Sequence, residues 1–211
     1  MKKIINENLS REIINVLQPS RPVLVTTTNI NESLNVAPFS WLTPISANPP
    51  MLALSLLSKP KKQNSLINIE RTREFGVNIP QIELLNKLVL SSFDYPKEKS
   101  KFEVLNFIPE NPVCINTKLI ASCKANLECK LKKIISPGDH SILIADIVAL
   151  HYNEKYFNEN FVINLTKATP CLHMQKYDLK NGQKRIFLSG LRSTFEITEH
   201  FPELPEGYYD E

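Results

Sequence analysis

Short apolar and β-branched runs, separated by polar residues and prolines, dominate the first part of the chain. Residues 23–28 (VLVTTT) are rich in β-branched side chains, and the polar segment NINES separates them from residues 34–41 (LNVAPFSW). This pattern predicts a β-hairpin whose second strand ends near Thr43-Pro44. Asn48-Pro49-Pro50 then marks a turn before residues 51–57 (MLALSLL), an apolar run suited to a buried strand.

Three other stretches carry apolar residues at helical spacing. Residues 4–17 do so and end before a proline, which predicts a short leading helix. Asn64 or Ser65 is the expected N-cap of a second helix over the following LINIERT. Residues 81–90 have the spacing of an amphipathic helix, and they follow an expected strand that ends at a proline.

Beyond residue 113 the expected elements are strands: an extended piece near 116–121, then 126–135 and 141–151, the last two joined by a turn at Pro137-Gly138-Asp139. Helices inserted into a mainly antiparallel β array predict an α+β, barrel-like domain. From Asn181 onward glycines and prolines interrupt any long element. We therefore expect one domain over residues 1–180 and a C-terminal extension over 181–211, packed on the domain or on a partner.

Composition narrows the class of protein. The chain has 211 residues, of which 42% are hydrophobic, so it can bury a sizeable core. Its 25 basic and 22 acidic side chains give a net charge of +3, too balanced for a nucleic-acid binder. No apolar run approaches the ~18 residues of a membrane span, and no signal-peptide core develops after Met1. We expect a cytoplasmic protein.

The positions of the cysteines, histidines and glycines exclude several kinds of site. The four cysteines and four histidines are scattered and contain no CxxC pair, so we expect structural thiols and no metal site. The five glycines form neither GxGxxG nor a Walker motif. An enzyme that uses NAD(P)H on this chain must hold it without a Rossmann fold.

The stretch from Asn35 to Asn68 has features of a ligand cradle. Pro38 has no amide hydrogen, so it should lie on a strand edge or at a bulge, and Ala37 leaves the backbone uncovered. Unpaired main-chain groups there match a heteroaromatic ring with carbonyl and imide groups. Lysines at 59, 61 and 62 precede the expected helix start, which favours a phosphate. The stretch predicts a site for a flat, phosphorylated ring.

The run RPVLVTTTNINESLNVAPFSWLTPISANPPMLALSL, followed by NSLINI and EFGVNI, resembles the flavin reductase family, whose fold is the FMN-binding split β-barrel. The resemblance extends through SSFDYP, KFEVLNF, NLECKL and GDHSILIADIVALHY and covers roughly residues 20–177. The chain departs from the family at the phosphate turn, where Gln63-Asn64-Ser65 replaces a common Lys-Asp-Thr triplet. Ser65 keeps the hydroxyl, and Lys62 is the expected source of the charge.

The resemblance implies FMN as cofactor, NAD(P)H as co-substrate, a homodimer, and free flavin, oxygen or a partner oxygenase as electron acceptor. No catalytic side chain is expected, because a flavin performs the hydride chemistry itself. The cofactor-binding residues expected on these combined grounds are Asn35, Ala37, Pro38, Phe39, Ser40, Trp41, Ser55, Lys59, Lys62, Ser65, Asn68, Ser92, Tyr95 and His140.

Other interpretations stay open at this point. Trp41 is also consistent with a core or subunit contact, and the lysine run with a solvated turn. His140 is also consistent with an exposed hairpin position, and the loop with Ser92 and Tyr95 with an Asp-capped turn. The alternatives to a reductase are a flavoredoxin-type FMN electron carrier, a pyridoxamine phosphate oxidase-like enzyme, and a non-catalytic flavin-binding module.

Overall fold

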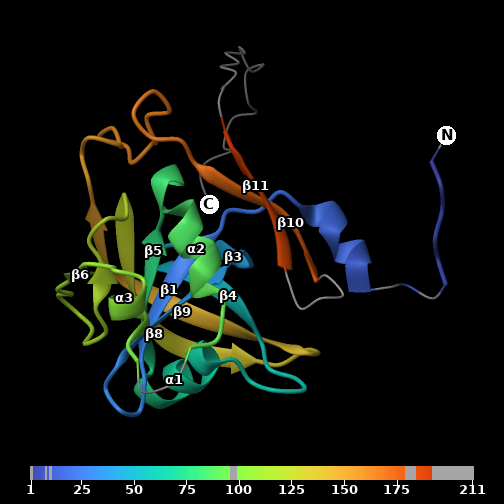
Figure 1. The fold of residues 1–211 in the computed structure, drawn as a ribbon, viewed down its shortest axis with the longest axis horizontal. Helices are drawn as coiled ribbons and strands as arrows, with labels where there is room; N and C mark the ends of the chain where they lie inside the picture. Colours follow the sequence, from blue (N-terminus) through green and yellow to red (C-terminus); the bar gives the residue numbers. More distant parts are fainter. Residues whose placement is uncertain (1, 8, 10, 96–98, 179–183, 192–211) are drawn as a thin grey trace, which may run out of the picture.

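A computed structural model describes residues 2–7, 9, 11–95, 99–178 and 184–191, and its main feature is a seven-stranded antiparallel sheet with the order β2-β1-β5-β8-β9-β4-β3 (Figure 1). These strands are β1 (Val23–Thr28), β2 (Leu34–Phe39), β3 (Leu42–Ala47), β4 (Pro50–Leu57), β5 (Glu74–Ile79), β8 (Ala125–Ile135) and β9 (His140–Tyr152). Two smaller sheets pair β6 (Pro109–Glu110) with β7 (Leu119–Ile120), and β10 (Cys171–Asp178) with β11 (Lys184–Gly190). The helical elements are η1 (Arg11–Leu17), α1 (Asn64–Thr72), η2 (Ile82–Leu84), α2 (Leu85–Ser91) and α3 (Lys101–Val104). The expected α+β, mainly antiparallel class is confirmed.

Two hydrophobic clusters hold the helices against opposite sides of strand β1. Val23 and Val25 join a cluster that includes Leu66 and Ile69 of α1. Leu24, between them, faces a second cluster with Leu88 of α2 and with residues of α3. This alternation follows from the period of two in a strand, so β1 is buried on both faces. The hairpin of β1 and β2 therefore lies between α1 on one side and α2 with α3 on the other.

The strand that begins with LNVAPF ends earlier than its sequence indicates. We expected it to reach Thr43-Pro44, but β2 ends at Phe39 and β3 begins at Leu42. The register gives the reason: Phe39 pairs with Val23 of β1, whereas Leu42 pairs with Leu54 of β4. The chain changes its pairing partner at Ser40 and Trp41, and one continuous-looking apolar stretch supplies both edges of the main sheet.

Two other expected elements are shorter in the structure. The helix expected over 4–17 is confined to η1, and Ile4 is 85% exposed, because no part of the described chain covers these apolar side chains. The strand expected over 116–121 shrinks to β7. Side chains of β5 accept hydrogen bonds from amides before and within β7: Asn116 N donates to Glu74 Oε1 at 2.8 Å, and Ile120 N donates to Asn78 Oδ1 at 2.8 Å.

The C-terminal part contains a strand that the glycine pattern did not predict. Strand β11 pairs with β10 over the register Cys171↔Gly190 to Asp178↔Lys184. Backbone bonds between Ser20 and His173, at 2.8 and 3.1 Å, fasten the hairpin to the chain that leads into β1 (Figure 1). The expected domain boundary at 180/181 and the segment 192–211 lie outside the described residues, so that division stays a prediction.

Candidate functional site

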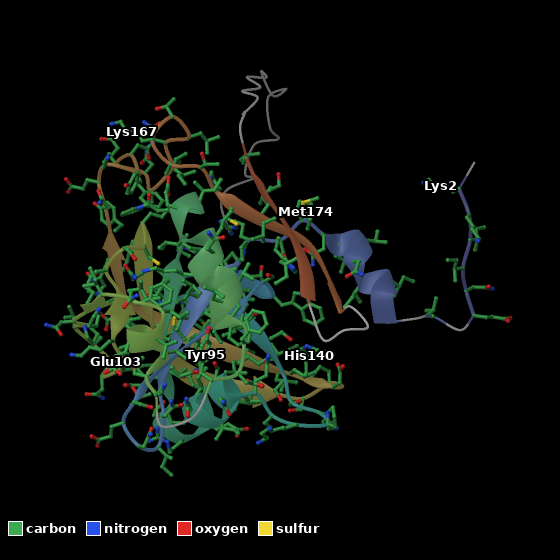
Figure 2. The ribbon with its side chains drawn as sticks, in the orientation of Figure 1. Lys2, Tyr95, Glu103, His140, Lys167 and Met174 are labelled. Carbon is green, nitrogen blue, oxygen red and sulfur yellow. The ribbon has the colours of Figure 1, made fainter. Side chains whose placement is uncertain are left out.

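A cavity of about 680 Å³ opens between the β2 edge, the start of α1, the end of α2 and the β10–β11 hairpin. Volumes of roughly 300–1,000 Å³ are usual for sites that hold small molecules and cofactors. Figure 2 labels Tyr95, which lines this cavity, and His140, which does not. No group of three His, Cys, Asp or Glu side chains among the described residues suits a metal, and no described helix is long and apolar enough to cross a membrane.

One wall of the cavity is the outer edge of β2. In the described chain β2 pairs with β1 and ends the strand order of the sheet. Four consecutive residues, 37–40, line the cavity, whereas a wall made by one face of a strand would use alternate residues. Pro38 presents no N–H there, as its sequence position predicted. The remaining main-chain groups of this edge are available to a ligand that can both donate and accept hydrogen bonds.

The opposite end of the cavity is electropositive. Helix α1 has Gln63 as its N-cap, not the expected Asn64 or Ser65, and no side chain caps the helix. Gln63 Oε1 instead accepts the Leu57 N–H at 2.9 Å, which ties the turn to β4. Asn64 and Ser65 of the first turn line the cavity. Uncapped amides and the helix dipole favour an anion at this position.

The lysines of this turn differ in what they can do. Lys62 Nζ lies 2.7 Å from both carboxylate oxygens of Glu70, so its charge is already paired. Lys61 also lines the cavity and makes no ion pair within the described part of the chain. Lys61, which was absent from the expected cofactor contacts, is therefore the better placed of the two for an incoming anion.

A buried amide network fixes the electropositive end to the sheet. Asn35 Nδ2 of β2 donates to Thr27 Oγ1 at 3.0 Å and to Ser65 Oγ at 3.1 Å. Asn68 Nδ2 of α1 donates to the same Thr27 oxygen at 3.0 Å and to Asn29 Oδ1 at 2.8 Å. Because buried polar groups are costly to leave unpaired, this network holds α1 in one position relative to β1 and β2.

Most of the expected cofactor contacts come together in the cavity wall: Asn35, Ala37, Pro38, Phe39, Ser40, Lys62, Ser65, Ser92 and Tyr95. Five others do not line it: Trp41, Ser55, Lys59, Asn68 and His140. Asn68 supports the wall through the amide network. Trp41 and His140 pack on each other with ring centroids 4.7 Å apart, and His140 Nδ1 lies 2.7 Å from Asp139 Oδ1. Contact of any of these residues with a cofactor stays a prediction.

Sequence reasoning missed the wall formed by α3 and the C-terminal hairpin. Lys101 lines the cavity and donates from Nζ to the Ser91 carbonyl at 3.0 Å. Burial lowers the pKa of Lys101, and nearby Asp94 opposes that shift. His173, Ile186 and Leu188 complete this side. Nothing local in the sequence marks these residues, because they reach the cavity only through tertiary packing.

Comparison with known proteins agrees with this architecture. The chain is 25% identical over 173 residues to an uncharacterized protein of Aquifex aeolicus, covering 81% of this chain and 88% of the relative. Nitrilotriacetate monooxygenase component B from Bacillus cereus superposes with a TM-score of 0.80 at 20% identity, over 93% of this chain and 98% of that one. An FMN-binding protein from Thermus thermophilus superposes with a TM-score of 0.74 at 17% identity, over 93% and 100%.

These neighbours share the expected split-barrel fold. The family model for the flavin reductase like domain matches residues 18–176, which include every strand of the main sheet and the residues at both ends of the cavity. The chain therefore belongs to the flavin reductase like domain family.

Proposed function

We propose that this protein binds FMN and transfers hydride from NAD(P)H to the flavin. The observation that carries the proposal is one cavity lined both by a strand edge and by an uncapped helix start, where Lys61 makes no ion pair with any described residue. An isoalloxazine ring needs hydrogen-bond partners along its edge, and its ribityl phosphate needs a cationic anchor. Membership of the flavin reductase like domain family supports the same assignment.

The residues present fit FMN. The main chain from Ala37 to Ser40, at the end of β2 and just beyond it, would hold the polar edge of the ring, and Asn64 and Ser65 of α1 with Lys61 would hold the phosphate. The bound flavin would supply the hydride chemistry, which no side chain of the cavity needs to perform. One phosphate-sized anchor favours FMN over FAD, whose adenylate adds a second phosphate.

The chain's own contribution to catalysis would be orientation and exclusion of water. Ala37 is small, so the strand edge leaves space for a second planar molecule beside the ring. Apolar side chains from two elements border the same cavity, namely Leu88 of α2 and Ile186 and Leu188 of β11. Stacking at a reacting distance of about 3–3.5 Å is the main requirement for hydride transfer between two bound rings.

Anaerobic reduction tests this proposal. Holoprotein purified with FMN should lose its visible flavin absorbance within seconds of adding NADH or NADPH, and added free flavin or oxygen should restore it. The rate should still rise at nicotinamide concentrations that saturate a Rossmann enzyme, because the chain has no GxGxxG loop. Dithionite serves as the control. Bleaching by dithionite but by neither nicotinamide would exclude the reductase and leave an electron carrier or a binding module.

A further inference from the structure

The phosphate turn of this chain offers few unpaired positive charges to the proposed ligand. FMN carries about −1.5 to −2 charges on its phosphate at neutral pH. Gln63 is neutral and its side chain is occupied by the Leu57 amide. Lys62 is paired with Glu70 through both carboxylate oxygens. Within the described part of the chain, Lys61 is the one cation of this turn that lines the cavity without an ion pair, and any further cation for the phosphate would come from another element.

Lys101, the first residue of α3, lines the same cavity. The residue before it, Ser100, donates from Oγ to the Leu34 carbonyl at 3.4 Å, at the start of β2. The next residue of β2, Asn35, donates to Ser65 Oγ in the first turn of α1 at 3.1 Å. This chain of contacts crosses the start of β2 and links the start of α3 with the start of α1.

The ammonium group of Lys101 has a hydrogen-bond acceptor among the described residues for only some of its N–H donors. Nζ donates to the Ser91 carbonyl at 3.0 Å and lies 5.6 Å from the centroid of the Tyr95 ring. A lysine ammonium has three N–H donors, and in the described part of the chain only one of them has a hydrogen-bond acceptor. Lys101 forms no ion pair with any described residue, although Asp94 also borders the cavity.

We infer that Lys101 is a phosphate-binding residue that faces the α1 start across the cavity and, together with Lys61, makes the site select phosphorylated over unphosphorylated flavin. This inference rests on the proposed function. Lys101 would supply, from a different element of the fold, the positive charge that Gln63 lacks. The lowered pKa of Lys101 agrees with it, because an incoming phosphate would compensate the cost of burying the ammonium.

Titrations of the apoprotein with FMN and with riboflavin, followed by flavin fluorescence, test the inference without any turnover. Riboflavin has the same ring and no phosphate. Lys101→Met should weaken FMN binding by about 10- to 100-fold, the effect of losing one charge-assisted hydrogen bond, and leave riboflavin binding unchanged. Lys101→Arg should restore most of the FMN affinity. Lys118→Met is the matched control, since Lys118 is half-buried and donates to Asn111 Oδ1 outside the cavity.

The outcomes separate this inference from the proposed function. An unchanged ratio of FMN to riboflavin affinity in Lys101→Met, including an equal loss of affinity for both ligands, would overturn the phosphate-binding role. Lys101 would then serve only to pack the chain around Ser91. Failure of the unmodified protein to bind either flavin would overturn the proposed function, and the inference with it. A loss confined to FMN in Lys101→Met, with the control variant unaffected, would support both.

Discussion

The four cysteines of this chain differ sharply in their surroundings. Cys114 is exposed, whereas Cys123, Cys129 and Cys171 are buried and all four are free thiols. Burial raises the pKa of Cys123 to about 12 and that of Cys171 to about 11, and it also raises the pKa of Cys129. Because the thiolate is the reactive form, the buried thiols should be inert at neutral pH.

Alkylation of the folded protein with iodoacetamide at pH 7.5 should therefore modify Cys114 alone. Intact-mass measurement should show one adduct for each chain, and Cys114→Ser should show none. Addition of denaturant should expose the other three thiols. Labelling of Cys123 or Cys171 before unfolding would contradict the buried positions assigned to them.

Glu128 is a fully buried carboxylate that fixes an outer segment to the sheet. Its oxygens accept the amides of Val113, Cys114 and Ile115 at 2.6–3.0 Å, and His151 Nε2 lies 2.6 Å away. Burial by itself would raise the pKa of Glu128, but these hydrogen bonds outweigh burial and lower it below the usual value of 4.5. The ionised carboxylate is therefore the form that the fold requires.

The lowered pKa determines how stability depends on pH. Its contribution should be complete above the unfolded pKa, near 4.5, and should be lost as the pH falls through the lower folded value. Glu128→Gln should lower the free energy of unfolding at pH 7 by about 1–3 kcal/mol, because one amide oxygen replaces two carboxylate oxygens. Urea unfolding at pH 7 and pH 3.5 measures this. The loss of unfolding free energy in Glu128→Gln should be smaller at pH 3.5 than at pH 7. Glu103→Gln, at an exposed position, should show no loss at either pH.

At the scale of elements, Gly76 sets how closely β5 can approach its neighbours. A Cβ at this position would collide with Thr26 Oγ1 of β1 and lie 2.7 Å from Leu119 Cδ2 of β7. Both neighbours are completely buried and have no space to move into. A side chain at 76 would therefore push β5 away from β1 and β7.

Gly76→Ala should destabilise the protein by about 1–3 kcal/mol, the usual cost of overpacking a core. Thermal or urea unfolding provides the measurement. Gly138→Ala is the matched control, because a Cβ there would meet nothing within 4 Å. If both variants unfold at the same midpoint as the original protein, the close contact between β5 and β1 is not present in solution.

For the whole molecule, we propose a symmetric dimer in which the second copy covers an exposed edge. Strands β2 and β3 end the sheet order, and Trp41 and Ile45 near the β3 edge are 40% and 46% exposed. Proteins seldom leave such edges open, and a twofold contact covers both copies at once. Light scattering at micromolar concentration should give about twice the 24.1 kDa chain mass. The monomer mass would refute the dimer.

Local patterns predicted the elements whose residues interact mainly with near neighbours. The β1–β2 hairpin, β4, α1, β5 and the β8–β9 pair follow from apolar runs and turn residues, and their positions are confirmed. Boundaries were wrong where a distant side chain took the backbone bonds, as Glu74 does beside β7. The break at Ser40 was also missed, because it depends on which strand each half of the stretch pairs with.

The sequence by itself determined the family. It also determined the strand-edge side of the cavity, because proline lacks an amide hydrogen wherever it lies. Only the tertiary structure decided which cations face that cavity. Lys61 and Lys62 are adjacent in sequence, yet Lys62 is paired with Glu70, and Lys101 comes from a helix that lies far along the chain from the predicted turn. Charge acts through space and not along the chain, so the electrostatics of the site became defined only when α1, β2 and α3 were packed together.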